Sequence, residues 1–308
     1  MKIAVFGGTG FVGSYIVEKL QNEGFIPRIL VRKMSKHKID IDCEIIEGSI
    51  DDISAIENTI LGTSAIIYNI GIIREFPKRG ITYEKLHFEG VKRCIHLAQK
   101  VGVKRFILMS ANGVKKNGTG YQITKWKADE LLKKSKLEWT IFRPSIIFGN
   151  PNGKERGEFC TQLRNDMLSL PFPAPLFFTG LLPIDAGNFS MSPIHVQNVA
   201  DFFVQSIKHQ DCIGKIYRIG GAKEYTWKEL IHCIALASNK RTWKMPAPVF
   251  IIKIIAKFLD RFSWFPVTYD QLSMLVEGNT VKEQYFENFN IKYKEFSLEN
   301  LAYLNHNK

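Results

Sequence analysis

The chain has 308 residues, of which 45% are hydrophobic and 23% are charged. This length predicts two domains, and the composition excludes a disordered chain, a fibrous chain and a small disulfide-stapled scaffold. The formal charge of +12 fits either a lysine-rich solvated surface or attraction to an anionic membrane or an acidic partner. No zinc-finger spacing or aromatic–basic motif accompanies the charge, so a nucleic-acid partner is not expected.

The five cysteines lie far apart and form no C-x-x-C pair. This pattern favours reduced thiols, a cytoplasmic protein and no metal site. Met1 and Lys2 lead directly into an apolar strand, and no run of about 18 apolar residues follows. Neither a signal peptide nor a membrane span is therefore expected. The histidines lack ligand spacing, and His195 is expected to be packed or hydrogen-bonded.

Strand-like and helix-like runs alternate through the first half of the chain. Strands are predicted at 2–6, 26–32, 43–47, 65–69, 105–110 and 139–142, and helices at 12–22, 53–61, 83–100 and 121–134. Because parallel strands need such crossovers, we expect an α/β fold with a doubly wound parallel sheet in a domain of residues 1–150. A smaller, mostly helical domain is expected over 151–308, with strands near 191–196 and 215–219 returning to the first sheet.

A glycine-rich turn follows the first predicted strand, with the spacing G-x-G-x-x-G at Gly8, Gly10 and Gly13. Such a turn brings bare backbone against a pyrophosphate, and the next helix directs its free N–H groups at the anion. Here the motif follows a strand and opens an amphipathic helix, which is the context that a Rossmann-like dinucleotide site requires. The candidate cofactor-binding residues of this turn are Gly7, Gly8, Thr9, Gly10, Phe11, Val12 and Gly13.

The second predicted strand ends in Arg32 and Lys33, where an NAD site usually carries Asp or Glu. A guanidinium can hold a 2′-phosphate through paired hydrogen bonds, whereas a carboxylate would repel it. Arg32 and Lys33 therefore favour NADP(H) over NAD(H) as the cofactor. The alternative interpretation is that they are two solvated surface charges on a basic chain and bind no phosphate. Asp51, after the third strand, is a second place where the adenine could be recognised.

Further segments resemble the extended or atypical branch of the short-chain dehydrogenase/reductase superfamily. They include GGTGFVG at 7–13, YQITK at 121–125 and FRPSIIFG at 142–149. Within this branch, residues 137–149 and 265–279 most resemble the accessory subunit of respiratory complex I and its bacterial relatives. The resemblance implies a Rossmann-like, NADP(H)-binding fold and, for the complex I member, no catalysis. It also implies that Asn69 and Gly71 border the cofactor and that Pro144 and Ser145 contact its nicotinamide end.

Tyr121 and Lys125 form the Y-x-x-x-K pair of this superfamily and share one helix face. The resemblance implies that the phenol exchanges a proton with the substrate, while the lysine binds the nicotinamide ribose and lowers the phenol pKa from about 10. Ser110 and Asn112 are further catalytic candidates, and Ser110 is also expected near the cofactor. Because Asn112 stands where an extended-type enzyme carries its hydroxyl, a live oxidoreductase and a structurally retained cofactor site both stay open.

Residues 248–265 form a wide apolar stretch with one narrow basic stripe, in which the polar residues Lys253, Lys257, Asp260 and Arg261 recur every three or four positions. The stretch is either a buried helix of the second domain or an interfacial helix with snorkelling lysines. The interfacial interpretation would place the protein peripherally at the inner face of a membrane, near a quinone-like or lipid-like substrate or a membrane complex. The apolar residues 171–182 could then line the same opening. A sugar-nucleotide epimerase or dehydratase is a third interpretation, which a hydrophobic second domain disfavours.

Overall fold

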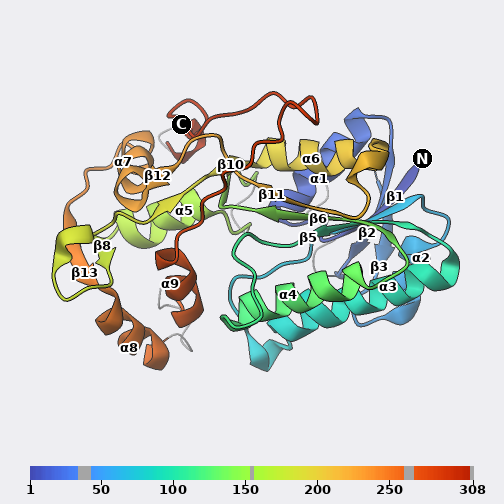
Figure 1. Ribbon diagram of the computed structural model, residues 1–308, viewed down its shortest axis with the longest axis horizontal. Helices are drawn as coiled ribbons and strands as arrows, with labels where there is room; N and C mark the ends of the chain where they lie inside the picture. The colour runs from blue at the N-terminus through green and yellow to red at the C-terminus, as the bar shows by residue number, and fades with distance from the viewer. Residues whose placement is uncertain (34–42, 153–155, 260–266, 306–308) are drawn as a thin grey trace. The chain divides into compact units, whose positions relative to one another are not determined.

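The computed structural model describes residues 1–33, 43–152, 156–259 and 267–305. The chain divides into two compact units (Figure 1). Unit 1 comprises Met1–Pro144, Val196–Arg218 and Tyr285–Lys292, and unit 2 comprises Ser145–His195, Ile219–Gln284 and Tyr293–Lys308. The chain therefore leaves unit 1 after Pro144 and returns to it twice.

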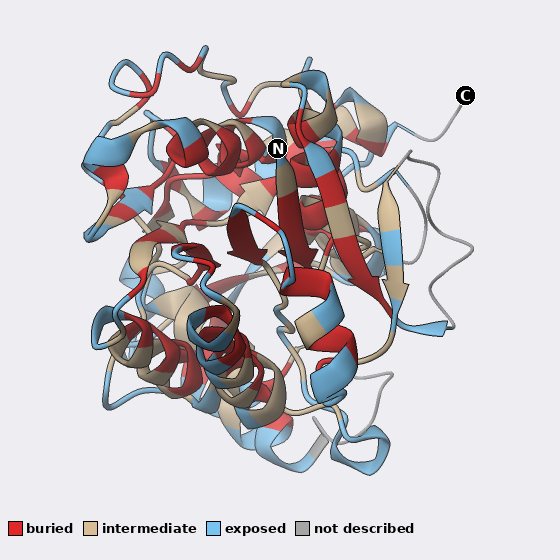
Figure 2. Cartoon of the chain, turned by 90° about the vertical axis from the view of Figure 1, so that its right-hand side faces the viewer, coloured by how far each residue is buried: buried red, intermediate tan, exposed pale blue. Residues whose placement is uncertain are grey.

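Unit 1 is built around one seven-stranded sheet with the order β11-β6-β5-β4-β1-β2-β3. The strands are β1 (Lys2–Phe6), β2 (Ile26–Val31), β3 (Glu44–Glu47), β4 (Ala65–Tyr68), β5 (Arg105–Met109), β6 (Glu138–Pro144) and β11 (Lys215–Ile219). The pairs from β6 to β3 are parallel. Every residue of β4 and β5 is buried, as in a sheet covered on both faces, whereas the edge strand β3 has exposed positions (Figure 2). The doubly wound α/β fold is confirmed.

Helices cover both faces of the sheet of unit 1 (Figure 1). The helices are α1 (Phe11–Asn22), α2 (Ile53–Ile60), α3 (Gly90–Val101), α4 (Gly120–Lys133) and α6 (Val196–Lys208), with short turns η2 (Pro77–Arg79) and η6 (Gln210–Cys212). A π-helical turn, η3 (Glu84–Glu89), runs directly into α3. Helix α1 packs against α6 on one face. Helices α2, α3 and α4 share a core with Phe6, Tyr68 and Phe106 on the other face.

The described residues of unit 2 form three two-stranded ladders and mostly short helices. The ladders join β7 (Ile147–Phe148) to β10 (Ile194–His195), β9 (Ser190–Met191) to β12 (Tyr225–Thr226) and β8 (Ala174–Phe178) to β13 (Lys244–Pro248). The helices are α5 (Phe159–Leu163), η4 (Arg164–Leu168), η5 (Pro183–Asp185), α7 (Trp227–Ala237), α8 (Val249–Leu259), α9 (Tyr269–Val276) and η7 (Ala302–Leu304). The core centres on Trp227, whose indole N–H donates to the carbonyl of Pro175 and whose ring stacks on Phe189.

The two late strand predictions differ in outcome. Residues 215–219 form β11 at the edge of the large sheet. Residues 191–196 do not enter that sheet, because Met191 pairs with Tyr225 and Ile194 pairs with Ile147, all within unit 2. A short apolar run suits either core equally well, so its periodicity does not say which sheet it joins. Within the described ranges, no helix is long and apolar enough to cross a bilayer.

Candidate functional site

Three glycines of the turn at the end of β1 have no room for a side chain: Gly7, Gly8 and Gly13. Gly7 has a φ of +93°, and a Cβ there would lie 3.0 Å from the backbone carbonyl carbon of Asn69. A Cβ on Gly13 would lie 2.0 Å from the carbonyl oxygen of Gly7, and one on Gly8 would lie 2.9 Å from Ile29. The Gly10 N–H donates to the same Gly7 carbonyl at 3.1 Å, which closes the turn. The turn therefore presents bare backbone, as a pyrophosphate cradle must.

Helix α1 begins at this turn without a side-chain cap, because its N-cap residue is Gly10. Thr9, Phe11 and Val12 are partly exposed around the cap, and Gly10 itself is exposed. The first-turn N–H groups and the positive end of the helix dipole are thus available to an anion. This cradle fits the diphosphate of a dinucleotide, and the chain's own residues supply it within unit 1.

Arg32 and Lys33 follow β2 and are both exposed. Because β2 is parallel to β1 and Leu30 pairs with Phe6, they leave the sheet at the same end as the glycine turn. The Asp51 side chain, which was predicted to recognise the adenine, is engaged in ion pairs. Its carboxylate pairs with the Lys85 ammonium at 2.7 Å and the Arg93 guanidinium at 3.3 Å. Asp51 therefore ties the end of β3 to η3 and α3, and adenine recognition by its side chain stays a prediction.

Tyr121 and Lys125 lie in the first two turns of α4. A capping box of Thr119 and Gln122 fixes the start of this helix. The Lys125 side chain is buried and donates to the carbonyl of Met109 at 2.8 Å. A Cβ on Gly71 would lie 3.6 Å from the Lys125 ammonium nitrogen, so the loop after β4 runs past this cation. The fold thus brings together Lys125, a predicted catalytic residue, and Gly71, which was predicted to border the cofactor.

Burial shifts the pKa values of both members of the pair. It raises the pKa of the Tyr121 phenol to about 12. It lowers the pKa of the Lys125 ammonium to about 8, against the opposing effect of the Asp129 carboxylate. A buried lysine whose hydrogen-bond acceptor is a neutral carbonyl is costly to keep, and such groups concentrate at functional sites.

Ser110 directs its hydroxyl to a buried carboxylate. It donates to Oδ2 of Asp129 at 2.9 Å, and the same oxygen accepts from Nε and Nη2 of Arg143 at 2.9 and 2.8 Å. Asp129 is fully buried. The Asn112 N–H donates to the carbonyl of Pro144 at 2.9 Å, so this backbone bond links the segment after β5 to the end of β6. The Ser110 hydroxyl therefore connects the end of β5 to Asp129 of α4.

Pro144 and Ser145 lie on either side of the boundary between the two units. Pro144 is the last residue of β6 and of the first segment of unit 1. Ser145 is buried in unit 2, where its hydroxyl donates to the carbonyl of Asn279 at 2.6 Å. The predicted contact of these two residues with the nicotinamide stays a prediction. His195, also in unit 2, is buried edge-on against Phe148, as the packed interpretation expected.

His87 belongs to the site, although its isolated position in the sequence gave no sign of this. Its Nε2 accepts the N–H of Ile72 at 3.1 Å, so its proton is on Nδ1, which lies 3.2 Å from the Thr124 hydroxyl. Its ring meets Tyr121 edge to face at 5.1 Å and stacks on Tyr83 at 5.3 Å. Burial holds the pKa of His87 well below its usual value. A neutral imidazole therefore links the loop after β4 to the start of α4.

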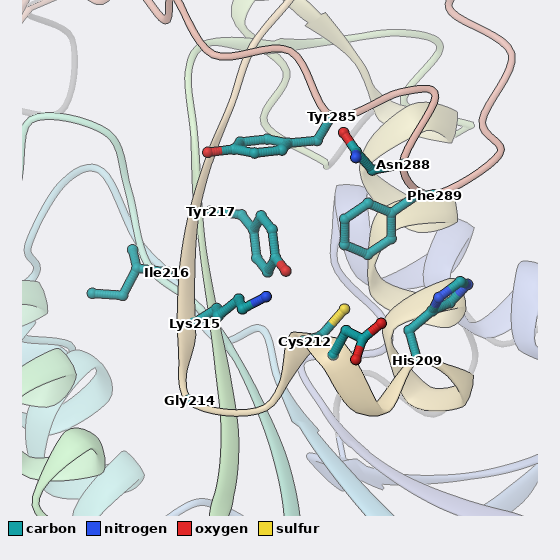
Figure 3. Close-up of a pocket in the computed structure, with 10 residues that line it drawn as sticks. His209, Cys212, Gly214, Lys215, Ile216, Tyr217, Tyr285, Asn288 and Phe289 are labelled. Atoms are coloured by element: carbon teal, nitrogen blue, oxygen red, sulfur yellow. The ribbon is translucent and has the colours of Figure 1, made fainter.

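A cavity of about 630 Å³ lies elsewhere in unit 1, along η6, β11 and residues 285–289 (Figure 3). The Tyr217 ring meets Tyr285 and Phe289 edge to face at 5.0 and 5.2 Å and forms its aromatic wall. Its lining, as far as the chain is described, includes none of the residues predicted to bind the cofactor. The cavity is therefore separate from the candidate dinucleotide site.

The profile of the NAD(P)H-binding family matches residues 7–166, which is just over half of the chain. The chain belongs to this family. This NAD(P)H-binding protein is 26% identical over 270 residues to the mitochondrial NADH-ubiquinone oxidoreductase 40 kDa subunit of Neurospora crassa, which covers 85% of the chain and 67% of that protein. It is 23% identical over 252 residues to the ceramide reductase of Caulobacter vibrioides, and this match covers 80% of the chain and 74% of that protein.

The fold of the NAD(P)H-binding protein is that of known dinucleotide-binding enzymes. The crystal structure of the Thermus thermophilus UDP-glucose 4-epimerase in complex with NAD matches it with a TM-score of 0.73 and 15% identity, covering 99% of this chain and 97% of that one. The predicted superfamily resemblance is confirmed, and so is the prediction that the protein binds a nicotinamide dinucleotide. A preference between NADP(H) and NAD(H) does not follow from these matches.

Proposed function

We propose that this protein is an NADPH-dependent oxidoreductase whose substrate is a hydrophobic carbonyl or quinone-like compound. The observation that carries the proposal is the buried Lys125 ammonium beside Gly71, four residues along α4 from Tyr121. Lys125 and the phenol-bearing Tyr121 are both on α4, and the Lys125 ammonium lies beside the loop that follows β4. A ribose with two hydroxyls would provide acceptors in addition to the Met109 carbonyl, to which this ammonium donates.

The preference for NADPH is part of the proposal and rests on Arg32. Its guanidinium is exposed directly after β2, at the end of the sheet that carries the glycine turn. An arginine there can hold a 2′-phosphate with two parallel hydrogen bonds, and Lys33 adds a second positive charge. A 2′-hydroxyl offers neither group a charge to neutralise.

The reduced nicotinamide supplies a hydride when the coenzyme is bound. Tyr121 is protonated at neutral pH, because burial raises the pKa of its phenol to about 12. It can therefore donate the proton that the oxygen of a substrate takes up on reduction. Lys125 is four residues from Tyr121 on the same face of α4, and its positive charge would favour the ionised phenol once the proton has left. His87 keeps the Tyr121 ring in place without adding a second charge.

The second candidate is an accessory protein that holds NADPH without turning it over. The arrangement of Ser110 favours this function, because its hydroxyl is committed to Asp129, and Asn112 replaces the expected hydroxyl of an extended-type enzyme. The match to the 40 kDa subunit of NADH-ubiquinone oxidoreductase supports it as well. Both candidates share the coenzyme site and a hydrophobic partner, and both suit a location at the inner face of a membrane.

Two measurements test the proposal. NADPH and NADH are titrated separately into wild type and Arg32→Glu, with Lys208→Glu as a control for an exposed cation of the same unit. Wild type should bind NADPH at least tenfold more tightly than NADH, and only Arg32→Glu should lose this preference. Tighter NADH binding by wild type would refute the phosphate assignment.

The reaction is tested with a panel of quinones and long-chain carbonyl compounds. Tyr121→Phe should abolish NADPH oxidation while leaving the Kd for NADPH within about threefold, because Phe keeps the ring that packs on His87. Wild type that binds NADPH but turns over no compound of the panel, and that co-purifies with a membrane complex, would favour the accessory function instead.

A further inference from the structure

Helix α8 of unit 2 carries apolar side chains on the face that it exposes. These residues are Phe250, Ile251, Ile254, Ile255 and Phe258, with exposed fractions of 55%, 42%, 57%, 39% and 64%. The opposite face is the packed one, since Val249 and Ala256 are buried and Ile252 contacts the core of unit 2. A helix on the surface of a globular protein normally has the reverse pattern, with its polar residues outward. The buried-helix interpretation of residues 248–265 is therefore wrong for α8, and residues 260–266 lie outside the described part.

A second exposed apolar segment leaves the same end of the β8–β13 ladder. The two strands are parallel, with Phe178 opposite Pro248, so the chain after β8 and the first turn of α8 both start at this end. Three residues that follow β8 are strongly exposed: Leu181, Leu182 and Ile184. Exposed apolar groups of this extent are unusual on a protein that stays free in water, and they mark a surface that contacts something apolar.

Basic side chains predominate along the chain around α8, although Asp185 lies in η5 beside the second apolar segment and Asp270 lies in α9. Residues 230–259 contain five basic side chains and no acidic one: Lys240, Arg241, Lys244, Lys253 and Lys257. On α8, Lys257 lies three residues after Ile254 and thus borders the exposed apolar face. Lys253 extends over the ring of Tyr269 on α9, with its ammonium 5.4 Å from the ring centre. An apolar face edged by lysines is the pattern of a helix that lies in the surface of an anionic membrane.

We infer that the exposed face of α8 docks on the surface of an anionic phospholipid bilayer, with Phe250, Ile254 and Phe258 below the headgroups. The lysines then lie at the level of the lipid phosphates. The helix is about 16 Å long, since each residue adds 1.5 Å, so it lies along the surface and does not cross it. A second copy of this chain fits the face less well, because α8 contains two lysines and no acidic side chain, so two such faces would bring lysines against lysines.

This inference rests on the proposed function in one respect, because it locates the hydrophobic substrate of that function in the bilayer on which α8 docks. The docking surface lies in unit 2, whereas the glycine turn, Arg32 and Lys125 lie in unit 1. Vesicle binding and coenzyme binding can therefore be lost independently. A wild-type protein that binds vesicles but neither coenzyme would contradict the proposed function and leave this inference standing.

The test is co-sedimentation of the full chain with vesicles, using phosphatidylglycerol mixed with phosphatidylcholine and, separately, phosphatidylcholine alone. Ile254→Glu is compared with Leu236→Glu, which places the same charge on α7 of the same unit at a leucine that is 54% exposed. Wild type and Leu236→Glu should bind the anionic vesicles, more weakly at high salt, and Ile254→Glu should bind at least tenfold less well. All three proteins should have the same Kd for NADPH.

Two results would overturn the inference. The first is equal vesicle binding by Ile254→Glu and Leu236→Glu, which would mean that α8 is not the contact. The second is a concentration-dependent dimer that Ile254→Glu dissociates, together with no vesicle binding by wild type. That result would assign the face to a second copy of the chain.

Discussion

The buried lysine of the candidate site should cost the protein stability, and its removal should make the cost measurable. The pKa of Lys125 is lowered by burial from 10.5 to about 8. At about 1.36 kcal/mol per pKa unit, this shift corresponds to about 3 kcal/mol of destabilisation at neutral pH. Replacing the lysine by Met also removes its hydrogen bond to the Met109 carbonyl, which is worth about 1 kcal/mol. Lys125→Met should therefore be more stable than wild type by about 2 kcal/mol at pH 7.

The sign of the pH dependence follows from the direction of the shift. Below pH 8 the lysine is charged in both the folded and the unfolded state, so its full cost is present. Between pH 8 and pH 10.5 the folded protein releases the proton while the unfolded chain keeps it, so wild type gains stability relative to the variant. The cost of the charge falls to about 1 kcal/mol near pH 10, where it no longer exceeds the value of the lost hydrogen bond.

The assay is urea unfolding of wild type and Lys125→Met at pH 7 and pH 10. Lys127→Met is the control, because Lys127 is on the same helix but is half-exposed in an ion pair with Glu84. That control should change the free energy of unfolding by less than about 1 kcal/mol at both pH values. A Lys125→Met protein that is less stable than wild type at pH 7, or whose advantage does not shrink at pH 10, would refute the assignment of a costly buried charge.

Three other substitutions test the rest of the site. Gly13→Ala should lower the melting temperature and weaken NADPH binding at least tenfold, because its Cβ would lie 2.0 Å from the Gly7 carbonyl oxygen. Gly10→Ala should lower the melting temperature less, because its Cβ would lie 3.3 Å from the same oxygen. Equal melting temperatures of the two variants would contradict this reasoning. His87→Phe should destabilise the fold by about 1–3 kcal/mol at pH 7, because the Ile72 N–H loses its acceptor. Wild type should also lose stability as the pH falls below 6.5, because the unfolded chain then takes up a proton that the folded protein refuses at His87, and the variant should lack this loss. Ser110→Ala should cost about 1 kcal/mol of stability and change the Kd for NADPH by less than threefold, whereas a large loss of turnover with intact stability would place its hydroxyl at the substrate.

The glycine turn was predictable because its information is local. The steric demands on Gly10 and Gly13 arise within seven residues of chain, and the positive φ of Gly7 is a property of the same turn. The strand before the turn and the helix after it both have clear periodicity. The same holds for the Tyr121 and Lys125 pair, which one helix fixes by its own geometry. Alternation of strands and helices likewise predicted the parallel sheet.

The orientation of Ser110 was not predictable, because it depends on groups that are distant in sequence. Its partner Asp129 comes from α4 and the competing donor Arg143 from β6, and neither spacing belongs to a recognisable motif. His87 escaped notice for a related reason. It lies in a π-helical turn, which places a side chain off the ordinary helical spacing, and such turns recur at functional sites. A lone histidine in a helical segment gives no indication of this in the sequence.

Helix α8 shows what periodicity can and cannot determine. The order of residues separated a face of Val249, Ile252 and Ala256 from a face of larger apolar residues, but both faces are apolar, so hydrophobicity alone could not say which one is packed. The structure packs the face that contains the smaller side chains against unit 2 and leaves the phenylalanines exposed. Folding of unit 2 alone would favour burying the larger side chains. The proposed contact with a bilayer would account for their exposure, and the response of vesicle binding to Ile254→Glu tests that explanation.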